Sequence, residues 1–190
     1  MVDSIRDAEG QRVFPTLLNT LLDILRNTEP SFKRDTQDFQ FRRVIMEIIH
    51  RIPLSEALRP IINTLTATLL HVIKTDTEEN AVTCLKIIID IVRTLKTFNE
   101  EHVKEFLAHV QDMLRSVERT AAEYFTESSP VLDANISLPS SRSFKVMSEV
   151  PVVVVLFSQM YRQVFQPFVP ELLSLLINVR VQYFDVMYDG

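Results

Sequence analysis

The fold follows from one stretch of the chain, Asn80-Ala-Val-Thr-Cys-Leu-Lys-Ile-Ile-Ile-Asp-Ile-Val-Arg-Thr-Leu-Lys-Thr-Phe98. Its apolar residues recur at three and four positions, which is the period of an α-helix with a wide buried face. The stretch contains no Gly or Pro, and capping residues precede it at Asp76 and Thr77. Three consecutive isoleucines at positions 87–89 favour a strand when taken alone. The length of the pattern and the polar residues spaced through it favour a helix.

The same pattern occurs earlier in the chain. Arg43–Ile52 aligns with Lys86–Leu95, with basic residues on basic, acidic on acidic and apolar on apolar. The spacing lies within the roughly 40 to 47 residues of HEAT-type repeats. A second internal similarity, or echo, at nearly the same spacing relates Leu17–Leu21 to Ile61–Leu65. In addition, Pro170–Leu176 resembles the segment that begins at Pro15. Two interleaved echoes indicate two kinds of helix that alternate, as they do in an α-solenoid.

The composition excludes several other classes of fold and function. The 190 residues are 46% hydrophobic, and their two glycines are Gly10 and Gly190. Because tight hairpins and phosphate-binding loops rely on glycine, an all-β fold, a doubly wound fold and a nucleotide-binding loop are disfavoured. The net charge of −5 argues against direct nucleic-acid or anionic-membrane binding as the main role. The sequence therefore predicts an all-α fold, a HEAT-type α-solenoid of antiparallel helix pairs.

The predicted solenoid is a single segment over residues 1–190. Its helices are expected at residues 11–27, 36–51, 55–75, 77–98, 99–125, 148–166 and 168–185. Helix 36–51 is expected to bury Phe41, Val44 and Ile48 among its apolar residues. Residues 126–147, rich in Ser and Pro, are expected to form a mobile insertion, so that deleting Ser128–Ser141 costs little stability. The last helix has an apolar face without a companion, which predicts a fragment of a longer superhelix.

No motif for catalysis or for a cofactor occurs in the chain. The single cysteine, Cys84, lies in an apolar pattern, which predicts a buried thiol and a reducing compartment. The four histidines do not have the spacing of a zinc site, so no metal and no cofactor are expected. No stretch approaches the roughly 20 apolar residues of a membrane span. The sequence therefore predicts a protein that is not an enzyme.

Two sets of residues are candidates for function. Arg42, Arg43 and Arg51 belong to a locally basic part of an acidic chain and could form a surface that contacts a protein. Solvated helix faces are the alternative interpretation of such charges. Ser129, Ser141 and Ser143 lie in the predicted insertion, where a kinase could phosphorylate them. Serines that only solubilise a loop are the alternative.

Three runs carry a resemblance to a known family. They are Ile45–Pro60, Glu78–Asp90 and Ser143–Leu156, of which the second reads Glu-Glu-Asn-Ala-Val-Thr-Cys-Leu-Lys-Ile-Ile-Ile-Asp. In that order they resemble the N-terminal HEAT region of the transformation/transcription domain-associated protein family, and the resemblance covers roughly Val13 to Val179. No catalytic residue of the family maps onto this segment.

The resemblance implies a function that the residues alone do not. It implies a non-catalytic scaffold segment of a very large pseudokinase of the phosphatidylinositol 3-kinase-related family, in the nucleus. The expected partners are other subunits of a histone acetyltransferase coactivator complex and transcription activators, with no direct nucleic acid and no membrane. Two alternatives remain, a cargo-binding module of a nuclear transport receptor and a HEAT segment of an active kinase of the same superfamily.

Overall fold

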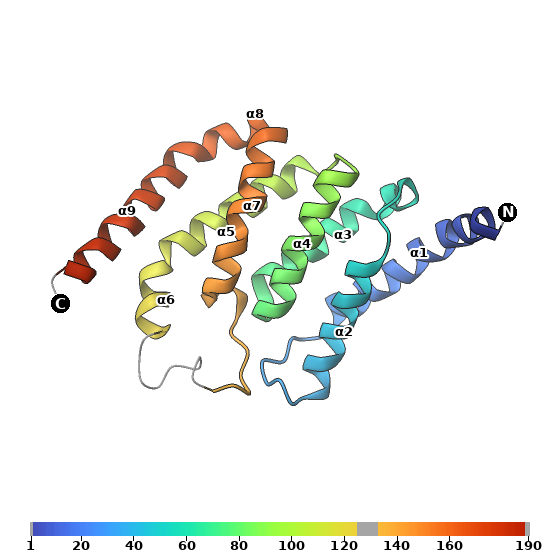
Figure 1. Ribbon diagram of the computed structural model, residues 1–190, viewed down its shortest axis with the longest axis horizontal. Helices are drawn as coiled ribbons and strands as arrows, with labels where there is room; N and C mark the ends of the chain where they lie inside the picture. Colours follow the sequence, from blue (N-terminus) through green and yellow to red (C-terminus); the bar gives the residue numbers. More distant parts are fainter. Residues whose placement is uncertain (1, 125–132, 189–190) are drawn as a thin grey trace.

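The computed structural model describes the backbone of residues 2–124 and 133–188, and the side chains of residues 13–117, 119–121 and 133–178 (Figure 1). Throughout these backbone ranges the chain forms helices and no strand. The elements are α1 (Val2–Asn27), α2 (Gln37–Arg51), η1 (Glu56–Ile61), α3 (Ile62–Thr75), α4 (Glu78–Thr94), α5 (Glu100–Arg115), α6 (Val117–Tyr124), η3 (Ser140–Arg142), α7 (Phe144–Met160), α8 (Arg162–Phe165), η4 (Gln166–Phe168) and α9 (Val169–Tyr188).

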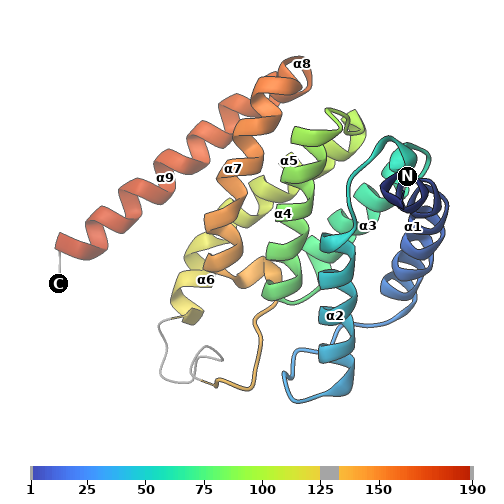
Figure 2. The ribbon, with the colours of Figure 1, turned by 45° about the vertical axis from the view of Figure 1, so that its right-hand side comes forward.

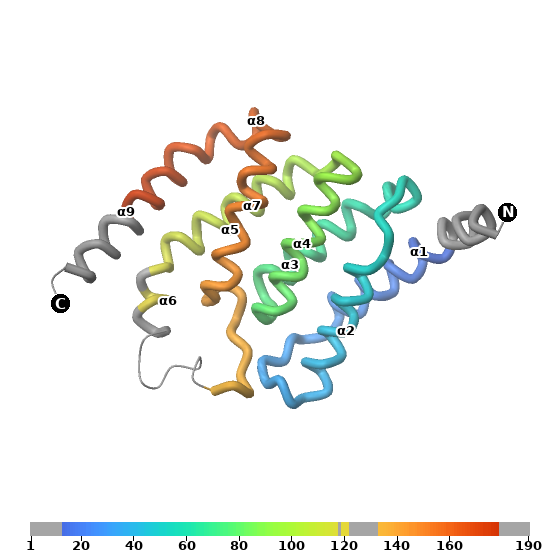
Figure 3. The backbone as a smooth tube through the Cα atoms, in the orientation of Figure 1, coloured from blue at the N-terminus to red at the C-terminus, as the bar shows by residue number. Residues whose placement is uncertain are grey.

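The helices form two layers, which can be followed from blue to red in Figures 1 and 2. One layer contains α1, α3, α5 and α9, and the other contains α2, α4 and α7. Within each layer, each helix packs on the next one of the same layer, and α3 also packs on α4. The smooth backbone trace in Figure 3 shows the same stacking of pairs. The predicted all-α solenoid of HEAT-like pairs is therefore confirmed.

The two layers correspond to the two echoes in the sequence. The segments Arg43–Ile52 and Lys86–Leu95 form parts of α2 and α4, both in one layer, whereas Leu17–Leu21 and Ile61–Leu65 contribute to α1 and α3 in the other. The core runs between the layers. It is centred on α4, whose apolar face, including Leu85, is fully buried. Burial of these apolar side chains is the main force that holds the helices together.

Local residues set where the helices begin and end. The side chains of Thr36 and Asn99 accept hydrogen bonds from backbone N–H groups in the first turns of α2 and α5. The predicted helix over residues 99–125 is divided at Ser116, where α5 ends and α6 follows. The Ser116 hydroxyl donates to the Met113 carbonyl at 3.0 Å. Such local bonds compete with the regular pattern of the helix.

The predicted insertion over residues 126–147 is only partly an insertion. Residues 125–132 lie outside the described part of the chain, but residues 133–143 pack against the fold. The backbone N–H of Ser137 donates to the Phe32 carbonyl at 2.8 Å, and Glu78 N–H donates to the Leu138 carbonyl at 2.9 Å. Ser137 and Ser140 are buried. The expectation that deleting Ser128–Ser141 costs little stability assumed an unpacked segment, whereas residues 133–141 are packed.

The expected burial of Phe41, Val44 and Ile48 is wrong. All three side chains are exposed on α2, with 51%, 53% and 39% of their surfaces accessible. They lie at i, i+3 and i+7, so they form one stripe on the helix. Apolar residues of α2 lie on two faces of the helix, and the buried ones belong to the side that packs on α1 and α4.

No individual helix in the described ranges is both long and apolar enough to cross a membrane. Phe144–Met160 and Arg162–Asn178 pass this test together, by length and composition, as a pair bent by 118°.

Candidate protein-interaction surface

The outward faces of α2 and α4 carry a regular arrangement of charges. Arg43 and Lys86 occupy equivalent positions in the two repeats, as do Glu47 and Asp90, and all four side chains are exposed. The helical period places each basic residue four positions before its acidic residue, on the same face. The two helices lie side by side, so this face presents alternating positive and negative charge to a partner.

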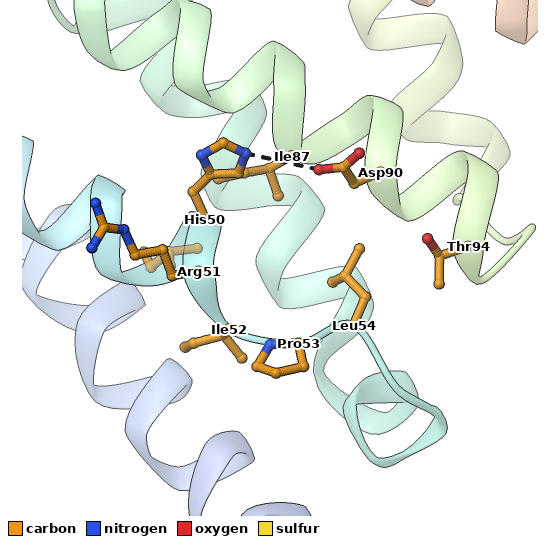
Figure 4. A pocket seen from close by; sticks show the side chains of 9 residues that line it. His50, Arg51, Ile52, Pro53, Leu54, Ile87, Asp90 and Thr94 are labelled. Atoms are coloured by element: carbon orange, nitrogen blue, oxygen red, sulfur yellow. Dashed lines mark ion pairs between the residues drawn. The ribbon is translucent and has the colours of Figure 1, made fainter.

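A surface pocket of about 310 Å³ opens where α2 ends beside α4 (Figure 4). The helix α2 stops at Arg51 because Pro53 follows and cannot continue the backbone hydrogen bonds. Ile52, Pro53 and Leu54 form an apolar wall with Ile87, and the polar lining consists of His50, Arg51, Asp90 and Thr94.

Charged groups stand at the rim of this pocket. His50 Nε2 lies 3.8 Å from Asp90 Oδ2, which joins the two helices across the pocket. Arg51 lies 3.6 Å from Glu47, and its side chain is 82% exposed. An apolar wall beside exposed charges suits a protein side chain with an apolar stem and a polar end. Arg51 is thus exposed beside the pocket, and Arg43 is exposed a little more than two helical turns earlier on α2.

Arg42 does not belong to this surface. Its side chain is 2% exposed and points into the fold, where Nε and Nη2 donate to Asp76 Oδ2 at 2.9 and 2.6 Å. Its Nη1 donates to the carbonyl oxygens of Leu25 and Thr28. A partner cannot reach this guanidinium, so the predicted three-arginine surface reduces to Arg43 and Arg51.

The three candidate serines have different environments. Ser129 lies outside the described residues. Ser141 is half-buried in η3. Ser143 is fully buried, donates to Glu78 at 2.6 Å and accepts from the N–H of Val146 as the cap of α7. A kinase therefore cannot reach Ser143 in the folded chain, because its hydroxyl is enclosed and already bonded.

A cluster of polar contacts, which we call the clasp, joins three distant segments. It consists of Arg34 from the α1–α2 loop, Glu78 and Glu79 at the start of α4, and Ser137 and Ser143 from the segment before α7. Arg34 donates to Glu79 at 2.7 Å, and Ser137 donates to the other oxygen of the same carboxylate. The two glutamates lie in the first turn of α4. Their partners lie 44 to 65 residues away, so no local spacing indicated them.

The clasp alters the acidity of Glu79. Partial burial raises the pKa of its carboxyl group, but hydrogen bonds from Ser137, its own backbone and Arg34 lower that pKa by more. The net pKa of Glu79 therefore lies below the usual value of 4.5. The carboxylate is charged at neutral pH and holds the segment before α7 against the start of α4.

Groups suited to catalysis do not gather in the described part of the chain. Cys84 is fully buried, and burial raises the pKa of its thiol well above the usual value. A thiol in this state is a poor nucleophile. No group of three or more His, Cys, Asp or Glu residues that could hold a metal ion occurs among the described residues.

Fold and surface together define a class, a segment of HEAT-like helical repeats with a charged outer face. Comparisons with known proteins find homologues over most of the chain. The chain is 28% identical to Transcription-associated protein 1 of Drosophila melanogaster over 196 residues, and 24% identical to the human Transformation/transcription domain-associated protein over 192. Each match covers 85% of this chain and 5% of the relative.

A fungal relative extends the comparison. The chain is 25% identical over 196 residues to the SAGA complex/NuA4 acetyltransferase complex subunit Tra1 of Schizosaccharomyces pombe, a match that covers 91% of the chain and 5% of the relative. No family model and no solved structure matches the chain. The chain is thus a homologue of the transformation/transcription domain-associated proteins, and the resemblance predicted from its sequence is confirmed. The chain spans about one-twentieth of the length of these relatives.

Proposed function

We propose that this chain is a non-catalytic scaffold segment of a large transcription-associated protein of the pseudokinase type. In this proposal the protein works in the nucleus as a subunit of a histone acetyltransferase coactivator complex. The observation that carries the proposal is the similarity over 85–91% of the chain to transcription-associated proteins, one of which is named as a subunit of the SAGA and NuA4 acetyltransferase complexes. Stacked helix pairs support the scaffold role, because they present extended surfaces to other proteins.

The outer face of α2 and α4 is the surface we propose for contacts with activators. The chain as a whole carries a net charge of −5, which repels acidic segments. Arg43 and Arg51 are exposed on this face, beside a pocket with an apolar wall. An activator segment with acidic residues and one apolar side chain matches this combination of charge and shape.

Affinity purification of the tagged full-length protein that contains this chain tests the proposed assembly. We expect acetyltransferase subunits to co-purify and the purified material to acetylate histones. Recovery of nuclear transport proteins without acetyltransferase subunits would refute the proposal and favour a transport receptor. Kinase activity of the purified protein on a peptide would refute the pseudokinase assignment.

A pair of charge-reversed proteins tests the docking face. Arg43→Glu combined with Arg51→Glu is expected to weaken activator binding and to remove most of its dependence on salt. The matched control is Arg59→Glu combined with Lys104→Glu, which reverses two exposed charges on η1 and α5. Salt dependence that persists unchanged after reversal of Arg43 and Arg51 would exclude this face as the docking site.

A further inference from the structure

Lys96, just after the end of α4, is held in an unfavourable backbone conformation. Its φ is 48°, in the left-handed region, and within the described part of the chain it is the one non-glycine residue with a positive φ. The turn requires this conformation, because the chain reverses there from α4 to α5 and the flanking Leu95 and Phe98 are both buried. Glycine has no Cβ, adopts this conformation at the lowest cost and is the usual residue after a helix. The turn therefore explains the conformation at this position but not the choice of lysine.

The described part of the chain makes no use of the charge of Lys96. The side chain is exposed, and its ammonium group forms no ion pair or hydrogen bond with any residue that the structure describes. Residues held in sparsely populated backbone conformations cluster at functional sites. A strained lysine without a partner inside the fold thus indicates a contact outside it.

Lys96 lies at the edge of the surface proposed for contacts with activators. It is two residues beyond Thr94, which lines the pocket where α2 and α4 end (Figure 4). Two residues span at most about 7 Å. The long, flexible stem of a lysine reaches over such a distance, so the ammonium group of Lys96 can meet a segment that occupies the pocket.

The outer face of α2 and α4 has more basic groups than it pairs internally. Its acidic residues, Glu47 and Asp90, each lie within 3.8 Å of a basic side chain. In contrast, Arg43, Lys86 and Arg93 are exposed and form no ion pair or side-chain hydrogen bond with the described residues. Arg93 follows Asp90 by three positions, so it lies on the same face of α4, toward the end that leads to Lys96. Unpaired cations in this arrangement complement an acidic segment.

We propose that Arg93 and Lys96 bind acidic residues of the activator segment, and that lysine is retained in the left-handed turn for this contact. The inference rests on the docking face proposed for activators and adds the residues that select an acidic partner. The apolar side chain of the segment enters the pocket, and its acidic residues continue past Thr94 along the end of α4. Lys96 strengthens this binding while it weakens the turn.

Substitutions of Lys96 separate these two effects. Lys96→Gly removes both the strain and the charge, so it is expected to raise the melting temperature of the chain by about 2 °C and to weaken binding about threefold. Lys96→Ala removes the charge but keeps the Cβ, so the same loss of binding is expected without the rise in melting temperature. Lys96→Arg keeps the charge and is expected to bind like wild type. A purely structural role of Lys96 would not change stability and binding in opposite directions.

Fluorescence anisotropy of a labelled synthetic peptide with the whole chain measures the binding. The peptide consists of aspartate and glutamate residues around one leucine. Its control, with asparagine and glutamine in place of the acids, is expected to bind at least about tenfold more weakly. Arg93→Ala is expected to weaken binding of the acidic peptide like Lys96→Ala. The matched control is Lys104→Ala, at an exposed lysine of α5 in the other layer, and it is expected to leave binding unchanged.

The outcomes distinguish this inference from the docking face on which it rests. Binding that is weakened by charge reversal at Arg43 and Arg51, but unchanged in Lys96→Ala and Arg93→Ala, would overturn the inference and retain the face. A wild-type chain that does not bind the acidic peptide would overturn both. A Lys96→Gly variant that melts below wild type would also overturn the inference, because lysine would then support the turn.

Discussion

Arg42 and Asp76 form an ion pair inside the fold, with Arg42 Nη2 at 2.6 Å from Asp76 Oδ2 and both side chains almost completely buried. The pair joins the middle of α2 to the turn between α3 and α4, and therefore one repeat to the next. Asp76 Oδ1 accepts further hydrogen bonds from the N–H of Thr77 and from the side chain of Asn80. The three guanidinium nitrogens and both carboxylate oxygens thus have hydrogen-bond partners, as buried charged groups require.

Removing one member of this pair is expected to destabilise the chain strongly. Arg42→Ala leaves the carboxylate of Asp76 buried without its counter-charge, which costs about 3 to 5 kcal/mol. Arg43→Ala, the neighbouring exposed arginine, is expected to change stability by less than about 0.5 kcal/mol. Urea unfolding followed by circular dichroism measures both. Similar losses in the two variants would show that Arg42 is not held in the interior.

The double variant separates the pair from the general effect of truncation. Arg42→Ala combined with Asp76→Ala removes both charges, so no uncompensated charge stays in the core. Its loss of stability is expected to be clearly smaller than the sum of the two single losses. Additive losses would mean that the two side chains do not interact.

Substitutions in the core between the layers provide a second prediction. Ile88 of α4 and Leu107 of α5 are fully buried, and Ile88→Ala or Leu107→Ala is expected to lower the free energy of unfolding by about 2 to 5 kcal/mol. The exposed Val152→Ala is the control and is expected to cost little. Thermal or urea melting provides the comparison. Equal effects at buried and exposed positions would contradict the two-layer packing.

The two layers could be predicted from the sequence because the spacing of the apolar residues repeats along the chain. One repeat relates α2 to α4 and the other relates α1 to α3, and in each case the two helices lie in the same layer. The exposed stripe of Phe41, Val44 and Ile48 on α2 could not be predicted in this way. Its residues are apolar like their buried equivalents in α4, and only the presence or absence of a neighbouring helix decides whether they are covered.

The burial of Arg42 did have a signal in the sequence. The shift of 43 residues that aligns Arg43 with Lys86 aligns Arg42 with Leu85, which is fully buried at the centre of α4. Charge alone suggested a surface residue, whereas its place in the repeat indicates the core. The acidic partner could not be found from spacing, because Asp76 lies 34 residues away in the turn before α4.

The packing of residues 133–143 against the fold could not be predicted either, because these residues have the composition of a loop. Their backbone groups bond to the α1–α2 loop and to the start of α4, and these contacts involve carbonyl and N–H groups that every sequence has. Such pairing is a property of the tertiary structure and not of local pattern.

Ser143 provides a third prediction, on how the clasp is anchored. Ser143→Ala removes the cap of α7 and the hydrogen bond to Glu78, and is expected to cost about 1 to 2 kcal/mol. Ser148→Ala is the matched control, because this exposed serine of the same helix bonds only to the Lys145 carbonyl of its own turn. Urea unfolding of both variants measures the difference. An equally small effect for the two serines would show that the segment before α7 is not held by Ser143.

The lowered pKa of Glu79 leads to a fourth prediction, on the dependence of stability on pH. The folded state holds Glu79 charged through Ser137 and Arg34, so its pKa is lower in the folded chain than in the unfolded chain. The resulting stabilisation is complete above the unfolded value of about 4.5 and is lost as the pH falls through the lower folded value. Other carboxylates titrate in the same range, so the informative quantity is the difference between wild type and a variant.

Glu79→Gln isolates that contribution. The variant is expected to be less stable than wild type at pH 7, and the difference is expected to shrink as the pH falls below about 4.5, because protonation of Glu79 then removes the charge from the wild type as well. Glu47→Gln, which removes an exposed carboxylate on α2, is expected to show a much smaller difference at every pH. Urea unfolding between pH 3 and pH 7 measures these curves. A difference for Glu79→Gln that stays constant over this range would show that Arg34 and Ser137 stabilise the fold independently of the charge of Glu79.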